Sequence, residues 1–283
     1  MSRYFILAAR EMSNARVKDL LKKYLSRGKV IFGIAKEEYI AGFENQPQFK
    51  TLKPDFVKKL AAKSAGRLEV IEYSQADGVE VINNLDFNRA IVINGSFHRS
   101  FHLRPEFMAI ADKKAELKYE SPFIDEEEAK NFAEKFSRPN KFPEFSESTI
   151  KQIIDEYSRH AFITDFQTAS AVVKGGQFIA LTHNPVVPYE TYAWHYGLSR
   201  EKYQTPVGDS SRYDTVHAET ATLIHAGPKA KGATIYVRTF PCPHCARNIV
   251  FAGIKEVIYE LDYGDKYGYN LFDKAGIKYR RLS

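Results

Sequence analysis

The chain has 283 residues, of which 44% are hydrophobic, 13% aromatic and 27% charged, so it can bury real cores, and its length suggests two domains. No apolar run approaches the length of a membrane span, and the apolar stretch from Tyr4 to Ala9 is cut short by Arg10 and Glu11, so no signal peptide is visible. The net charge of +6 is shared equally between residues 1–150 and 151–283, which favours a mixed-charge surface over a nucleic-acid-binding stripe.

The first half of the chain alternates between short β-rich runs and amphipathic helical patterns. The predicted strands are residues 4–9, 30–35, 67–73 and 90–94, and the predicted helices are residues 15–25 and 54–63. Strands that alternate with helices predict a Rossmann-like α/β domain with a largely parallel sheet over residues 1–136. We recognise no family in this domain, and its function stays open.

Four basic side chains, His98, Arg99, His102 and Arg104, follow the last predicted strand of this domain. In open α/β sheets ligands gather beyond the carboxyl ends of the strands, and this donor set suits a phosphate. We therefore consider an anion site here. The alternative is that the histidines make ordinary polar contacts while the arginines face solvent or the other domain.

A polar segment with two prolines, residues 137–150, predicts a linker, and a second domain then covers residues 151–283. Within it, two β-rich runs around Lys174-Gly175-Gly176 predict a β-hairpin. An aromatic-rich stretch follows that contains Trp194, the sole tryptophan. Trp194 could stack against a bound base, or it could simply fill a core.

The most informative residues lie further on, where His217 and Glu219 precede Cys242 and Cys245, the only cysteines of the chain. A catalytic zinc takes three protein ligands and leaves one position open, and one imidazole with two thiolates from a C-x-x-C turn supplies that number. Glu219 stands two residues after His217, where it can lie beside the metal without ligating it and act as general acid and base.

A C-x-x-C sequence alone could also be a redox pair or half of a structural zinc site. A redox pair needs no upstream H-x-E, and a four-cysteine site needs two more cysteines. H-x-E followed by P-C-x-x-C is the signature of zinc deaminases that act on cytosine or adenine rings. The combination therefore indicates one catalytic zinc per chain, bound by His217, Cys242 and Cys245.

The flanking sequence, residues 232–259, resembles the deoxycytidylate (dCMP) deaminases of the cytidine deaminase-like superfamily, which carry a similar strand, Phe-Pro-Cys turn, helix and Ala-Gly-Ile-Lys-Glu-Val strand. The resemblance extends over residues 153–279. It implies a three-layer α/β/α domain, a zinc cofactor, a small-molecule nucleotide as substrate, a homo-oligomer, and hydrolytic conversion of dCMP to dUMP and ammonia.

The resemblance also implies substrate contacts. Asn184 would meet the sugar, the Ala218 backbone N–H and Glu219 would hold the pyrimidine edge, and the carbonyl around Phe240 would accept from the amino group. This chain has His183-Asn184-Pro185 where dCMP deaminases typically have Tyr-Asn-Gly. The choice between dCMP, CMP, dCTP and cytidine, and any regulation by triphosphates, therefore stay open.

Two other functions remain possible at this point. A nucleic-acid deaminase, acting on tRNA adenosine or on cytosine, shares the zinc motif, but the tRNA type usually has Glu-Pro-Cys where this chain has Phe240-Pro241-Cys242. A nucleotide-binding regulatory protein could instead hold a structural zinc. A reduced cysteine pair without export signals predicts the cytoplasm as its location, and neither nucleic acid nor a membrane is expected as a partner.

Overall fold

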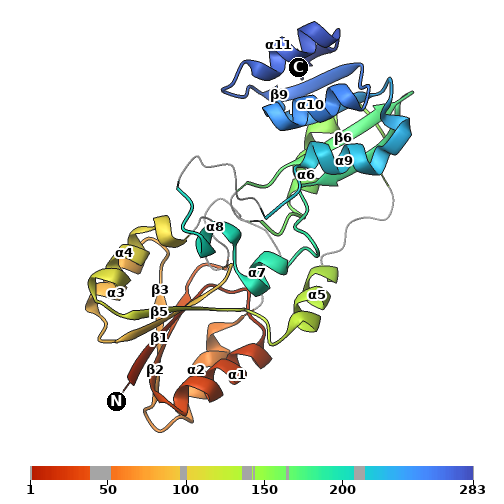
Figure 1. Cartoon of the computed structure of the whole chain (residues 1–283). Coiled ribbons are helices and arrows are strands. Elements are labelled where there is room, and N and C mark those ends of the chain that lie inside the picture. Colours follow the sequence, from red (N-terminus) through yellow and green to blue (C-terminus); the bar gives the residue numbers. More distant parts are fainter. Residues whose placement is uncertain are drawn as a thin grey trace. The chain divides into compact units, whose positions relative to one another are not determined.

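The structure is a computed structural model that describes residues 2–38, 52–95, 101–135, 142, 144–163, 166–206 and 214–282. The chain divides into two units (Figure 1). Met1–Phe136 and Thr191–Asp214 form the N-terminal unit, and Ser137–Glu190 and Thr215–Ser283 form the C-terminal unit. The chain therefore passes from one unit to the other three times.

The N-terminal unit is built on a five-stranded, fully parallel sheet of strand order β3-β2-β1-β4-β5. Its elements up to residue 134 are β1 (Ser2–Ala8), α1 (Asn14–Leu25), β2 (Gly28–Ala35), α2 (Pro54–Ala62), β3 (Leu68–Tyr73), α3 (Gly78–Asn84), β4 (Arg89–Ile93), α4 (Pro105–Asp112), β5 (Glu116–Glu120) and α5 (Glu126–Glu134). The direction of winding reverses between β1 and β4, as in doubly wound folds. The predicted α/β domain with a parallel sheet is confirmed, while its Rossmann-like character stays a prediction.

Successive side chains of β1 point to opposite faces of the sheet, and each face has its own core. Tyr4 and Ile6 pack with α1 and α2, whereas Phe5 and Leu7 pack with α3 and α4. All six predicted elements of this unit agree with the structure within two residues at each end, but α3, α4 and β5 were not predicted.

A buried carboxylate, Glu120, fastens the end of β5 to α1. It accepts hydrogen bonds from Arg16 Nη2 at 3.1 Å, Lys23 Nζ at 2.6 Å and Tyr24 Oη at 2.6 Å, and Lys118 Nζ lies 3.1 Å away. Four donors around one carboxylate compensate for its removal from water.

The segment that contains α7 (Tyr192–Tyr196) and α8 (Ser199–Lys202) belongs to the N-terminal unit, which differs from the predicted single domain over residues 151–283. The reason is that its side chains find their partners there. Trp194 is 1% exposed and packs against Gly95 and Phe132, and Thr191 Oγ1 donates to the carbonyl of Ala129 in α5. This segment, Thr191–Asp214, is called the excursion below.

The C-terminal unit has a mixed sheet of order β10-β9-β8-β6-β7. Its elements are α6 (Ile150–Ser158), β6 (Ala169–Lys174), β7 (Gln177–His183), α9 (Ala218–Ala226), β8 (Thr234–Thr239), α10 (Pro243–Phe251), β9 (Glu256–Leu261), α11 (Tyr267–Ala275) and β10 (Lys278–Arg281). Strands β8, β9 and β10 are parallel, and β6 is antiparallel to both β7 and β8.

Helices cover both faces of this sheet. α9, α10 and α11 pack on one face around Ile235 and Val257, and α6 packs on the other face against Tyr236 and Ile258. The predicted three-layer α/β/α architecture is confirmed. The predicted hairpin is β6 and β7, which pair in antiparallel register from Lys174 and Gln177 onwards on either side of two glycines at positive φ.

Among the described residues, no helix has both the length and the apolar character needed to cross a membrane.

Candidate functional site

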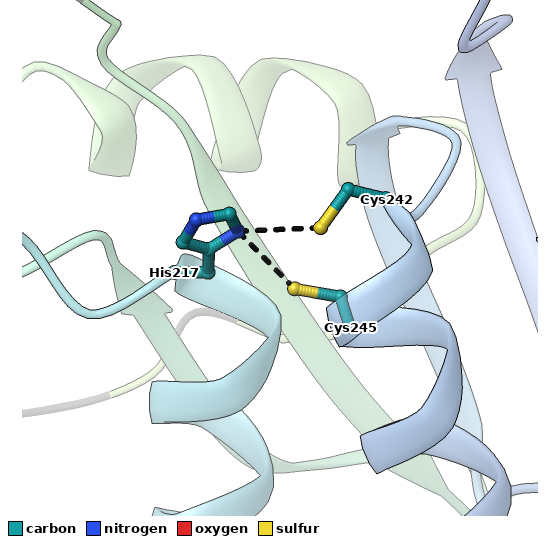
Figure 2. A group of neighbouring side chains, drawn as sticks. All are labelled: His217, Cys242 and Cys245. Atoms are coloured by element: carbon teal, nitrogen blue, oxygen red, sulfur yellow. Dashed lines mark hydrogen bonds between the residues drawn. The ribbon is translucent and has the colours of Figure 1, made fainter. Parts of the chain in front are cut away.

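The three predicted metal ligands lie together in the C-terminal unit. His217 directly precedes α9, Cys242 directly precedes α10, and Cys245 lies in the first turn of α10. Nδ1 of His217 is 3.5 Å from Sγ of Cys242 and 3.3 Å from Sγ of Cys245. Figure 2 shows the imidazole nitrogen pointing between the two sulfurs. The three ligand atoms lie within 4.8 Å of one another, so this group could bind one metal ion.

The spacing of these atoms can be compared with that of a zinc centre. Zn–S bonds of about 2.3 Å and Zn–N bonds of about 2.0–2.1 Å, at a tetrahedral angle, place nitrogen and sulfur about 3.5 Å apart. The observed separations of 3.5 and 3.3 Å agree with this value. The donor set also fits zinc, because thiolate and imidazole are its preferred protein ligands. Three ligands leave the fourth position open.

The protonation of the group without a metal follows from its contacts. A hydrogen bond from Cys245 lowers the pKa of the Cys242 thiol to about 4, although its burial acts in the opposite direction. The contact with Cys242 raises the pKa of His217 and is also the main cause of the raised pKa of Cys245. One thiol of the pair is therefore ready to ligate as a thiolate.

Glu219 lies in the first turn of α9, two residues beyond His217. Burial raises the pKa of its carboxyl above the ordinary value, and the negative charge of Cys242 acts in the same direction. A raised pKa makes a carboxylate a stronger proton acceptor than an ordinary glutamate. This is the property that a general acid and base requires beside a metal centre.

The start of α9 is fixed by buried hydroxyl groups that the sequence analysis missed. Thr222 Oγ1 donates to the Ala218 carbonyl at 2.8 Å and lies 2.6 Å from Ser170 Oγ on β6. Thr182 Oγ1 on β7 contacts the same Thr222 hydroxyl. Ser170, Thr182 and Thr222 are at most 2% exposed. They hold the helix turn that carries Glu219 against two strands of the sheet.

Cys245 has a second neighbour from α9. Thr220 Oγ1 lies 3.9 Å from Sγ of Cys245 and accepts a hydrogen bond from Asn248 Nδ2 at 2.9 Å. Hydrogen bonds to ligand sulfurs orient the ligand and tune the metal. Thr220 stands one residue after Glu219, but its role is visible only once α9 and α10 are packed together.

The predicted sugar contact, Asn184, follows directly after β7 and is 4% exposed. Its Oδ1 accepts from the backbone N–H of Thr168 at 3.0 Å, and its Nδ2 donates to the carbonyl of Phe166 at 2.8 Å. The amide therefore holds the segment before β6 in place. One N–H and one lone pair of the amide are not used in these two bonds, so a contact to a sugar stays a prediction.

The other two predicted substrate contacts involve backbone groups. Ala218 is the first residue of α9, where backbone N–H groups have no partner within the helix. Phe240 is 1% exposed and stacks on Tyr269 with ring centroids 3.6 Å apart. Its side chain therefore belongs to the core, which leaves the carbonyl as the only part able to take the predicted role.

The predicted anion site in the N-terminal unit differs from what the structure describes. His102 Nδ1 lies 2.9 Å from Glu201 Oε2, and Arg104 donates two hydrogen bonds to Glu106. These two side chains thus already have carboxylate partners. His98 and Arg99 lie outside the described residues. Of the two alternatives for Trp194, the structure agrees with the second, because its side chain is buried in the core of the N-terminal unit.

Comparisons with known proteins agree with this geometry. A family model described as MafB19-like deaminase matches residues 146–279. A probable deoxycytidylate deaminase of Drosophila melanogaster is 31% identical over 98 residues, or 32% of this chain and 48% of that protein. A deoxycytidylate deaminase of Schizosaccharomyces pombe is 28% identical over 149 residues, or 50% of this chain and 46% of that protein. The chain thus spans about half the length of these curated relatives.

Among solved structures, the dCMP deaminase of cyanophage S-TIM5 in complex with dCMP and dUMP is similar at 20% identity and a TM-score of 0.36, covering 50% of this chain and 100% of that chain. The family model and the curated relatives support a dCMP deaminase-like domain of the cytidine deaminase superfamily in the C-terminal half of the chain. The N-terminal half is outside the region that the family model matches.

Proposed function

We propose that this chain catalyses the zinc-dependent hydrolytic deamination of a cytosine mononucleotide, with dCMP as the first candidate. The observation that carries the proposal is the convergence of one imidazole nitrogen and two sulfurs at zinc-like separations, with Glu219 in the adjoining helix turn. The relatives in Drosophila melanogaster and Schizosaccharomyces pombe are a probable and a named deoxycytidylate deaminase, which supports the choice of substrate class. In the reaction the bond between C4 and the amino group breaks, a C4 carbonyl forms from water, and ammonia leaves.

His217, Cys242 and Cys245 would hold the zinc, which when bound supplies the Lewis acidity that makes water a nucleophile at neutral pH. Glu219 accepts a proton from the attacking water and delivers it to the departing amino group. Its raised pKa suits both steps. The Ala218 N–H and the Phe240 carbonyl orient the pyrimidine edge, and Asn184 contacts the sugar.

The test is to incubate the zinc-loaded full chain separately with dCMP, CMP, dCTP, cytidine and a cytosine-containing single strand, and to measure ammonia and the uracil product. We expect turnover of one mononucleotide. Replacement of the general acid and base in Glu219→Gln should lower the rate about 10²- to 10⁴-fold while zinc stays bound.

Absence of deamination of every free nucleotide tested would overturn the proposal. Activity on the strand alone would then indicate a nucleic-acid deaminase. Ammonia release from none of the compounds, combined with loss of folding on chelation, would indicate a regulatory protein with a structural zinc. The predicted homo-oligomer and the cytoplasmic location stay predictions, each open to a direct measurement.

A further inference from the structure

The backbone that leads into His217 is held by a short pairing with the segment after β7. Val186 and Thr215 form an isolated antiparallel bridge, and the N–H of Val216 donates to the carbonyl of Pro185 at 2.9 Å. We call residues 185–186 and 215–216 the neck, because they enclose the excursion at its base. His217 is the next residue after the neck, and it enters α9 at once.

The neck fixes His217 from the N-terminal side, as α9 fixes it from the C-terminal side. The other two ligands, Cys242 and Cys245, come from a different strand–helix junction, between β8 and α10. The separation between the imidazole and the sulfurs therefore depends on how firmly the neck is held. A displacement of 185–186 would move His217 relative to both cysteines.

One side chain, Glu190, holds the first strand of the neck. Its Oε2 accepts from the backbone N–H of Val186 at 3.3 Å, and its Oε1 lies 3.0 Å from Nε2 of His183. His183 is fully buried and Val186 is 2% exposed. The carboxylate thus contacts the residue before Asn184 and the residue after Pro185, and it connects the end of β7 to the neck.

The sequence gives no sign of this role, because Glu190 lies in no recognised motif and its partners precede it by four and seven residues in an irregular loop. Its side chain is 22% exposed, so the carboxylate is partly desolvated and its hydrogen bonds are stronger than those of a surface glutamate.

We propose that Glu190 is a positioning residue of the metal centre, which acts through Val186 and Thr215 to hold His217 at ligating distance from the two cysteines. The inference rests on the proposed function, since it treats His217 as a zinc ligand. The contacts that carry this role are those of the Glu190 carboxylate with Val186 and His183, and they reach His217 through the neck. Removal of Glu190 should therefore weaken zinc retention before it affects the fold of the unit.

The experiment measures the zinc affinity of the folded full chain by competition with a chromophoric chelator, in the wild type and in Glu190→Ala. Partners that orient metal ligands typically contribute 10- to 100-fold to metal affinity, so for this indirect contact we expect a loss of about tenfold. Hydrogen exchange of the Val186 amide should be faster in the same variant, because its acceptor is gone.

A matched control is Glu260→Ala. Glu260 is a glutamate of the same unit with similar exposure, 24%, and an ion pair to Lys151 at 2.6 Å, and it lies on β9 away from the neck. We expect its zinc affinity to be unchanged. Glu190→Asp, which keeps the charge but shortens the reach, is measured alongside and should also weaken zinc binding, so the test survives if Glu190→Ala fails to fold.

Wild-type zinc affinity in folded Glu190→Ala would overturn the inference, as would wild-type affinity in Glu190→Asp if the alanine variant does not fold. Equal losses in Glu190→Ala and Glu260→Ala would also overturn it, because they would show general destabilisation. A wild-type chain that binds zinc but deaminates no nucleotide would remove the proposed substrate and leave this comparison of zinc affinities intact.

Discussion

Replacement of Thr222 by valine tests whether the buried hydroxyl groups under α9 stabilise the C-terminal unit. Valine has nearly the shape of threonine, so the change removes the hydroxyl with little change in packing. Thr222 Oγ1 donates to the Ala218 carbonyl at 2.8 Å and is 2.6 Å from Ser170 Oγ, and it also contacts Thr182 Oγ1. All three hydroxyl-bearing residues are buried.

The size of the effect follows from what valine leaves behind. Ser170 Oγ and Thr182 Oγ1 each lose a partner inside the unit, and a buried polar group left unsatisfied costs about 1–3 kcal/mol. Thr182 Oγ1 keeps a long contact of 3.4 Å to the Ala218 carbonyl, which reduces its share. We expect the free energy of unfolding of the C-terminal unit to fall by roughly 2–3 kcal/mol.

Urea unfolding followed by circular dichroism measures this change. Trp194, the only tryptophan, lies in the N-terminal unit, so its fluorescence is an internal reference for that unit. The triple variant Ser170→Ala, Thr182→Val, Thr222→Val is the decisive control. Because it removes all three hydroxyls, it should recover much of the loss.

A change below about 0.5 kcal/mol in Thr222→Val would refute the reasoning, since surface substitutions away from special features fall in that range. So would a triple variant whose loss equals the sum of the single losses, because additive losses would mean that the hydroxyls act independently.

Three further predictions concern the two units separately. Hydrogen bonds from Lys23, Tyr24 and Lys118 outweigh the effect of burial and lower the pKa of Glu120 to about 2. Its contribution to the free energy of unfolding, at most about 3 kcal/mol, is therefore present above pH ~4.5 and should be lost as the pH falls towards 2. In an acid titration followed by Trp194 fluorescence, the stability of Glu120→Gln should depend less steeply on pH than that of the wild type, and equal slopes would contradict this. Gly95→Ala should lower the stability of the N-terminal unit to thermal unfolding more than Gly66→Ala does. Both glycines have positive φ, for which a side chain costs about 1–2 kcal/mol, but only at Gly95 would the added Cβ lie 3.1 Å from the Trp194 ring. Equal losses of stability in the two variants would contradict the crowding at Gly95. Chelation of zinc should lower the midpoint of thermal unfolding of the C-terminal unit and leave the Trp194 transition in place, with recovery on adding zinc back; a midpoint insensitive to chelation would speak against zinc at this site.

The metal ligands were accessible from sequence because their chemistry fixes both residue type and spacing. His217, Cys242 and Cys245 allow few other arrangements, and the structure brings all three together. The fold class was also accessible, since α1 and the first strands follow the periods of regular helices and strands. β5 was missed because Glu116, Lys118 and Glu120 give it the composition of an exposed loop, although Glu120 is buried by its partners.

Contacts between residues distant in sequence account for the other misses. His102 and Arg104 were considered as donors to a phosphate, and no residue close to His102 in the sequence indicates its partner Glu201, which lies 99 residues away. The sequence around Trp194 allowed either a base pocket or a core position, with the core as the more common outcome for aromatic clusters, and the packing against Gly95 and Phe132 decides for the core. Glu190 has the same character, since its role depends on the loop geometry that joins Val186 to Thr215.

The excursion has a practical consequence for anyone who wishes to separate the two units. A fragment that starts at residue 137 would carry Trp194 and Glu201 without the side chains that bury them, so it would expose the Trp194 ring to water and leave Glu201 without its His102 partner. An N-terminal fragment that ends at residue 136 would lack the same pieces of its own core. Neither unit can therefore be isolated by a single truncation: isolating the C-terminal unit requires removal of residues 1–136 and of the excursion, and a new turn from Glu190 to Thr215.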